Sequence, residues 1–157
     1  MATGQGNTWV LVADAHHARI FDVEDAGLVP RLRMTLHARP DGSAAIEGGR
    51  PDEAAGHGAK TGGPEHGWTT GDYTPGEAEE HRFVHELVRV LDRGVADTHF
   101  QHLVVVAPPK LLGLLRGGLT PELAQRLRAS THKDWGHLPD RELADQVRPL
   151  VEIWPQR

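Results

Sequence analysis

The chain has 157 residues, no Cys and a formal net charge of −5 at pH 7. The lack of Cys excludes disulfides and thiolate metal sites, and the negative charge disfavours broad nucleic-acid binding, which depends on a basic surface. No apolar run approaches the roughly 18 residues of a membrane span. The first eight residues lack Lys and Arg, so we expect a cytoplasmic protein that does not insert into membranes. The length favours a single domain over residues 1–157.

The N-terminal part predicts three strands. Residues 9–13 form a continuous apolar run, which is typical of a strand that is buried on both faces of a sheet. After a turn at residues 14–17, residues 18–23 predict a second strand. Residues 28–37 alternate imperfectly between apolar and polar side chains and predict a third, half-exposed strand. The short connections between them favour an antiparallel meander.

Residues 38–75 form a Gly-rich stretch that has almost nothing to bury. The stretch holds half of the chain's 18 Gly, and Ile46 is its only aliphatic side chain larger than Ala. Long segments without secondary structure are uncommon inside small domains, and they are usually functional or disordered. We therefore expect a long loop that is held out from the core and is a candidate contact loop.

A long amphipathic helix is predicted directly after this stretch. The side chain of Thr74 and that of Glu77 are spaced to cap the helix reciprocally, and Pro75 suits its first position. Apolar residues then recur every three or four positions, at Phe83, Val84, Leu87, Val88, Val90, Leu91 and Val95.

The C-terminal half predicts a second buried strand and several short elements. Residues 103–107 repeat the all-apolar pattern of residues 9–13. The elements expected after it are helices at 110–116 and from Thr120 to about 128, a strand at 129–135, and a helix from Leu138 to about 147.

This order of elements predicts an α/β fold. We expect a mixed sheet of about five strands, in which an antiparallel three-strand meander is joined to parallel crossovers and helices flank the sheet. The two all-apolar strands, which contain Val10 and Val104, are expected to lie side by side at its centre.

Several residues suggest chemistry without forming a recognisable catalytic motif. Asp14 ends the predicted central strand, where α/β proteins usually bind ligands. It would serve a magnesium-dependent nuclease only if other carboxylates converged on it, whereas an isolated Asp in this place commonly caps a turn. The candidate partners are Glu77, Glu79, Glu80 and Asp134.

Metal and nucleotide motifs are weaker still. His81 and His85 are spaced to lie on one helix face, but Arg82 follows His81 where a zinc metalloprotease has Glu. The Gly-rich residues 56–63 match a phosphate-binding loop in composition but not in spacing. We therefore expect no catalytic residue, no metal site and no cofactor.

Basic side chains surround the last two predicted crossovers. They are suited to phosphate contacts, although a solvated helix face is the alternative interpretation. The set consists of Lys110, Arg116, Arg126, Arg128 and Lys133.

Five segments together resemble the bacterial host attachment protein family. The most specific are the Val-Ala-Pro-Pro block that ends at Pro109 and the Lys-Asp-x-x-His-Leu block of residues 133–138; the others are residues 9–14, 18–21 and 112–115. That family is similar in turn to the middle domain of archaeal and eukaryotic class-I peptide release factors. The resemblance implies a ribonuclease H-like fold.

The release-factor resemblance gives the Gly-rich stretch an expected role. In release factors this loop carries Gly-Gly-Gln, whose Gln helps to position the hydrolytic water at the ribosome. Here Pro64 follows Gly62 and Gly63, and Pro has neither a side-chain amide nor a backbone N–H. The resemblance therefore implies contact without peptidyl-tRNA hydrolysis.

Three functional hypotheses follow. The first is a non-catalytic binding module that contacts the ribosome or a structured RNA. The second is a protein–protein interaction or host-cell attachment role, and the third is a metal-dependent hydrolase. The sequence leaves the partner and the oligomeric state open. The residues expected to make the contact are Gly62, Gly63, Pro64, His66, Lys110, Arg116, Lys133 and Asp134.

Overall fold

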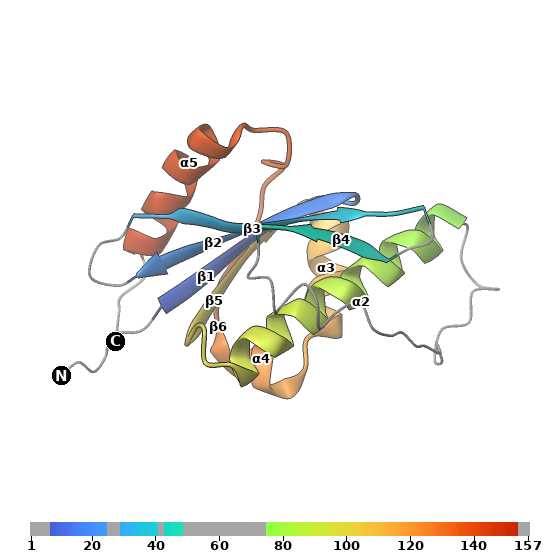
Figure 1. Ribbon diagram of the computed structural model, residues 1–157, viewed down its shortest axis with the longest axis horizontal. Coiled ribbons are helices and arrows are strands. Elements are labelled where there is room, and N and C mark those ends of the chain that lie inside the picture. Colours follow the sequence, from blue (N-terminus) through green and yellow to red (C-terminus); the bar gives the residue numbers. More distant parts are fainter. Residues whose placement is uncertain (1–6, 25–28, 41–42, 49–74, 154–157) are drawn as a thin grey trace.

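A computed structural model describes residues 7–24, 29–40, 43–48 and 75–153. Within these ranges the chain forms a mixed sheet of six strands in the order β4-β3-β2-β1-β5-β6. Helices α2, α3 and α4 lie on one face of the sheet and α5 lies on the other (Figure 1). The elements are β1 (Asn7–Ala13), β2 (His17–Glu24), β3 (Arg31–Ala38), β4 (Ala44–Glu47), α2 (Pro75–Ala96), β5 (His102–Ala107), α3 (Pro109–Gly118), α4 (Pro121–Arg126), β6 (Leu127–His132) and α5 (Asp140–Ile153).

The mixed α/β architecture is confirmed, with one strand more than expected. Strands β1, β2 and β3 form the predicted antiparallel meander. The additional strand β4 lies inside the stretch that was expected to be a loop, and it pairs antiparallel with β3. Ile46, the one large aliphatic residue of that stretch, lies opposite Leu36 and packs on the core. Residues 49–74 of the predicted loop lie outside the described residues.

The two all-apolar strands meet at the centre of the sheet, as predicted. Strands β1 and β5 run parallel, and Val10 lies directly opposite Val104. Both strands are covered on both faces, so alternate side chains enter two different apolar clusters. This double burial explains why neither sequence alternates with polar residues.

The larger apolar cluster lies between the sheet and helices α2 to α4. Helix α2 begins at Pro75, as predicted, and buries Phe83, Leu87 and Leu91 against the sheet. The predicted partner in its capping box, Thr74, lies outside the described residues. Near the end of the helix, Gly94 allows a close approach, because a Cβ there would lie 2.8 Å from the ring of Trp9.

The smaller cluster lies under α5. It gathers Val10, Val12, Phe21 and their neighbours from the sheet with Leu143 and Val147 from the helix. Helix α5 extends to Ile153, beyond its predicted end, and includes Pro149 in its later part.

Two predicted boundaries between α3 and α5 shift slightly. Helix α4 starts as expected, since the Thr120 hydroxyl accepts a hydrogen bond from the backbone N–H of Leu123 at 3.2 Å. The helix ends at Arg126, two residues before its predicted end. Strand β6 correspondingly begins and ends earlier than the predicted strand at 129–135.

Candidate functional site

The carboxyl ends of three parallel strands bring together residues that are far apart in the sequence. Strands β1, β5 and β6 run in the same direction, so Asp14, the start of α3 and the segment after β6 meet at one edge of the sheet. The backbone N–H of Lys133 donates to the carbonyl of Ala107 at 3.2 Å, which fixes the segment to the end of β5. Ligands usually bind at this edge in α/β proteins.

Asp14 caps the turn between β1 and β2. Its Oδ1 accepts hydrogen bonds from the backbone N–H groups of His16 and His17, both at 2.9 Å. Its Oδ2 lies directly beside Gly136, where a Cβ would collide with the carboxylate. The turn-capping interpretation of Asp14 is therefore confirmed, and Gly136 supplies the space that this carboxylate needs.

Arg19 holds the segment that follows β6. The residue is only 6% exposed. One terminal nitrogen donates to the carbonyl of Leu138 at 2.6 Å and to Asp140 Oδ1 at 2.9 Å, and the other donates to the carbonyl of Gly136 at 2.9 Å. A buried guanidinium needs such partners, because an unpaired buried charge is costly. Arg19 therefore has a structural role, because it binds the segment after β6 to the edge of the sheet.

His17 adds a second contact to the same segment. Its Nε2 lies 3.0 Å from the carbonyl of Gly136, and its Nδ1 lies 3.1 Å from Asp14 Oδ1. Its ring stacks on that of His37, with centroids 6.1 Å apart. We call Asp14, His17 and Arg19, with the segment 136–140 that they contact, the polar clamp.

The clamp and the cluster under α5 together hold residues 135–138 of the Lys-Asp-x-x-His-Leu block. Trp135 and Leu138 of this block pack on the cluster under α5, and the backbone between them is bound by Arg19 and His17. Sequence reasoning missed Arg19 and Gly136, because their partners are more than 100 positions away and leave no local pattern.

The predicted basic residues do not form one patch. The ammonium group of Lys110 lies 3.9 Å from Glu77 and 3.7 Å from Glu80 on α2. Arg126 pairs with Glu122, and Arg128 contacts the ring of His102.

The other predicted contact residues are exposed or lie outside the described part. Lys133 and Asp134 are exposed at the sheet edge, whereas Arg116 is exposed in the last turn of α3, about 9 Å along the helix from Lys110. The structure thus brings Lys110, Lys133 and Asp134 to the same edge and leaves Arg116 apart. Gly62, Gly63, Pro64 and His66 lie outside the described residues.

The described side chains do not gather into a metal-binding group. Within residues 7–24, 29–40, 43–48 and 75–153, no three His, Asp or Glu side chains are close enough together to hold a metal ion. His85 is exposed on α2 and His81 is half-buried. Glu77 and Glu80 contact Lys110 instead of converging on Asp14.

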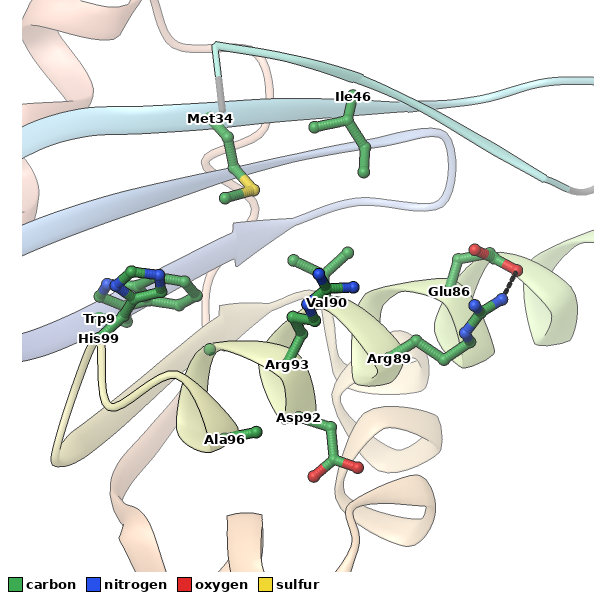
Figure 2. A pocket seen from close by; sticks show the side chains of 11 residues that line it. Trp9, Met34, Ile46, Glu86, Arg89, Val90, Asp92, Arg93, Ala96 and His99 are labelled. Atoms are coloured by element: carbon green, nitrogen blue, oxygen red, sulfur yellow. Dashed lines mark hydrogen bonds and ion pairs between the residues drawn. The ribbon is translucent and has the colours of Figure 1, made fainter. Parts of the chain in front are cut away.

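A concave feature lies on the face of the sheet that α2 covers. A hollow of about 350 Å³ opens between α2 and strands β3 and β4, with Trp9 and His99 at one end (Figure 2). Sequence reasoning missed it, because its lining comes from β1, β3, β4 and α2. We call this feature the α2 hollow; it is lined by Trp9, Met34, Ile46, Glu86, Arg89, Val90, Asp92, Arg93, Gly94, Ala96 and His99.

One carboxyl close to the hollow has a perturbed pKa. Burial raises the pKa of Asp22 above its ordinary value, while the guanidinium of Arg33, 3.9 Å away, acts in the opposite direction. Asn7 also donates a hydrogen bond to Asp22 at 2.9 Å. Arg33 in turn lies over the ring of Trp9, 5.2 Å from its centroid.

The fold and the site together define a class of protein. It is a three-layer α/β protein with a mixed sheet, and polar residues at the carboxyl edge of the sheet bind its own backbone. None of the described helices is both long and apolar enough to cross a membrane.

Comparison with known proteins then gives the family. A family model described as "Protein required for attachment to host cells" matches residues 9–147. The match covers nearly the whole chain, and the chain belongs to this host attachment family. No curated protein matches the sequence.

Proposed function

We propose that this member of the host attachment family is a non-catalytic binding protein that engages a protein partner during attachment. The observation that carries the proposal is the polar clamp. Asp14, His17 and Arg19 lie where an α/β enzyme would place reactive groups, yet their hydrogen bonds go to backbone groups and to Asp140. Groups held in this way position a surface and are not arranged to act on a substrate.

The charges at the sheet edge favour a protein partner over RNA. Two glutamates neutralise Lys110, and Asp134 follows Lys133 directly. Tight binding to a phosphate backbone requires several uncompensated cations. An edge with mixed charges is suited to a protein surface, where complementary charges set orientation and specificity.

The proposed contact surface keeps the residues singled out in the sequence. Lys110, Lys133 and Asp134 form its described part at the sheet edge. Arg116, Gly62, Gly63, Pro64 and His66 are proposed as outlying contacts.

Contact with the ribosome or a structured RNA, the first hypothesis from the sequence, is the second candidate. The order of a strand meander, a long helix, a buried strand and further helices supports a relation to the release-factor middle domain and a ribonuclease H-like fold. The same order is compatible with other α/β proteins, so it favours this candidate only in combination with binding data.

Complementation tests the non-catalytic role. Cells that lack the gene are expected to attach poorly to host cells, and the wild-type gene is expected to restore attachment. The Asp14→Asn variant keeps the Oδ1 acceptor of the turn but loses the carboxylate, so it should restore attachment to the same level. A Lys133→Glu variant should restore less, because Lys133 is exposed at the proposed contact surface. Failure of Asp14→Asn with a folded protein would instead favour a catalytic carboxylate.

Ribosome co-sedimentation tests the partner class. The purified chain should not co-sediment with ribosomes in low salt. Binding that weakens steeply as salt is added would indicate phosphate contacts and replace the protein partner by RNA. Incubation of RNA with the chain and Mg²⁺ or Mn²⁺ tests the hydrolase hypothesis, for which we expect no cleavage above that of the Asp14→Asn variant.

A further inference from the structure

The α2 hollow has an apolar interior. Met34 from β3 and Ile46 from β4 form one wall, and Val90 from α2 faces them (Figure 2). At one end the ring of Trp9 stacks on that of His99, with centroids 6.0 Å apart and an angle of 11° between the planes. An aromatic or branched aliphatic group would bury its surface against these side chains.

Four charged side chains line the hollow, the acidic Glu86 and Asp92 and the basic Arg89 and Arg93. Asp92 belongs to the lining, but its carboxylate points away from the hollow and accepts a hydrogen bond from the Thr120 hydroxyl at 3.3 Å (Figure 2). Glu86 lies 3.5 Å from a terminal nitrogen of Arg89, so these two charges offset one another.

Arg93 is the basic side chain whose terminal nitrogens are considered for a ligand. Its side chain leaves α2 about one turn after Val90 and lines the hollow (Figure 2). The Nε of this side chain forms an ion pair with Asp97, whose Oδ2 lies 3.6 Å away. The terminal nitrogens of a guanidinium form a planar pair of donors that matches a carboxylate.

We propose that the α2 hollow binds a small apolar carboxylate, with its apolar body between Met34, Ile46 and Val90 and its carboxylate on Arg93. This site goes beyond the proposed contact surface, which lies at the carboxyl edge of the sheet, whereas the hollow lies between α2 and strands β3 and β4. The hollow of about 350 Å³ is at the lower end of the range for ligand pockets, so the ligand is compact. A phenyl ring on a short carboxylate chain has the matching size and polarity.

The acid 4-phenylbutyrate and its amide form a matched pair of probes, because they differ in charge and hardly in shape. A ligand of about 12 non-hydrogen atoms is expected to bind with a Kd in the millimolar range or below, so titration to about 10 mM is sufficient. Binding is measured by NMR on the full ¹⁵N-labelled chain, from the shifts of the backbone amides of residues 86–96. We expect the acid to bind about tenfold more tightly than the amide.

Two arginine variants test the carboxylate contact. Arg93→Gln should bring the affinity for the acid down to that for the amide. Arg141→Gln is the control, since Arg141 is also exposed on a helix but does not line the hollow, and it should leave both affinities unchanged. An unchanged preference for the acid in Arg93→Gln would overturn the assignment of the charged contact.

A third variant tests the apolar part of the site. Val90→Phe should fill the hollow and weaken both probes, while circular dichroism confirms that the chain is folded. If Val90→Phe does not fold, Val90→Ala should still alter both affinities, because Val90 would face the phenyl ring. The proposal fails if neither probe shifts the amides of residues 86–96. It also fails if 4-phenylbutyrate does not bind but a peptide that ends in Phe does bind through its free carboxylate. The natural ligand would then be a protein terminus.

Discussion

The two faces of the sheet are held to their helices in different ways. On the face of α2 to α4, a large cluster that includes Trp9, Phe83 and Phe100 forms an apolar core. On the α5 face, a smaller cluster consists mainly of valines, and the polar clamp supplements it at the carboxyl edge of the sheet. One face therefore depends on apolar burial, and the other depends in part on hydrogen bonds to a buried Arg.

This difference changes where function is to be sought. At the carboxyl edge the polar groups of the clamp hold the segment 136–140. We therefore seek function on the surface that the clamp supports and not in the chemistry of the clamp residues. On the opposite face the apolar core leaves the α2 hollow, which Arg93 helps to line. We therefore propose contact with a macromolecule at the edge and binding of a small ligand in the hollow.

The largest expected effect comes from the apolar face. Phe83→Ala removes a fully buried ring under α2, and such substitutions cost about 3–5 kcal/mol of unfolding free energy. Chemical denaturation measures the loss. Val29→Ala is the control, because Val29 is 51% exposed and should change the stability little. A loss below about 1 kcal/mol in Phe83→Ala would contradict the division between an apolar face and a polar face.

The corresponding test of the α5 face is Arg19→Met. The change leaves the carbonyls of Gly136 and Leu138 without their guanidinium partner, at a cost of about 2–3 kcal/mol. Asp140 is largely exposed, so water replaces its contact with Arg19.

In the same Arg19→Met variant, hydrogen exchange should accelerate in residues 135–138 more than in α2. Arg141→Met, at an exposed position, should change neither quantity. Equal acceleration in both regions would show that the clamp does not act locally.

The central strands and the main helix could be predicted because their signals are local. A continuous apolar run of about four to eight residues indicates a buried strand, and apolar positions three or four apart over about 11 residues or more indicate an amphipathic helix. The pairing of Val10 with Val104 followed from burial on both faces. Strand β4 could not be predicted, because it is four residues long and contains only one large apolar side chain. Strand β4 pairs antiparallel with β3, which directly precedes it in the chain, and its own composition does not indicate a strand.

The candidate site was less accessible to sequence reasoning. The turn-capping role of Asp14 could be predicted, because it is local and involves only His16 and His17. The contacts of Arg19 span more than 100 residues, and an Arg inside a strand usually reaches solvent. The hollow depends on three strands and a helix that only the folded chain brings together.

A smaller effect is expected from a close approach on the apolar face. Gly94→Ala would place a Cβ 2.8 Å from the Trp9 ring and 2.9 Å from that of Phe100, and overpacking of this kind costs about 1–3 kcal/mol. Gly113→Ala in α3 is the matched control, because nothing lies within 4 Å of its Cβ. This control should be stabilised by up to about 1 kcal/mol, since Ala favours the helix. Thermal unfolding distinguishes the two, and stabilisation of both would mean that Trp9 moves aside easily.

The smallest effect concerns the pH dependence of the apolar face. Burial raises the pKa of Asp22 above its ordinary value of 3.8, so the folded state binds the proton more tightly than the unfolded state does. The contribution of Asp22 to the unfolding free energy therefore decreases as pH rises from about 3.8 to the raised pKa, and it is constant above that pKa.

The Asp22→Asn variant tests this pH dependence, because it keeps an acceptor for Asn7 but does not titrate. The stability of the wild type relative to this variant should therefore fall as pH rises through that window. Asp134→Asn, at an exposed position on the opposite edge, controls for net charge. A relative stability that rises through the same window would mean that Arg33 outweighs burial, and that the apolar face accommodates an ionised carboxylate next to Trp9.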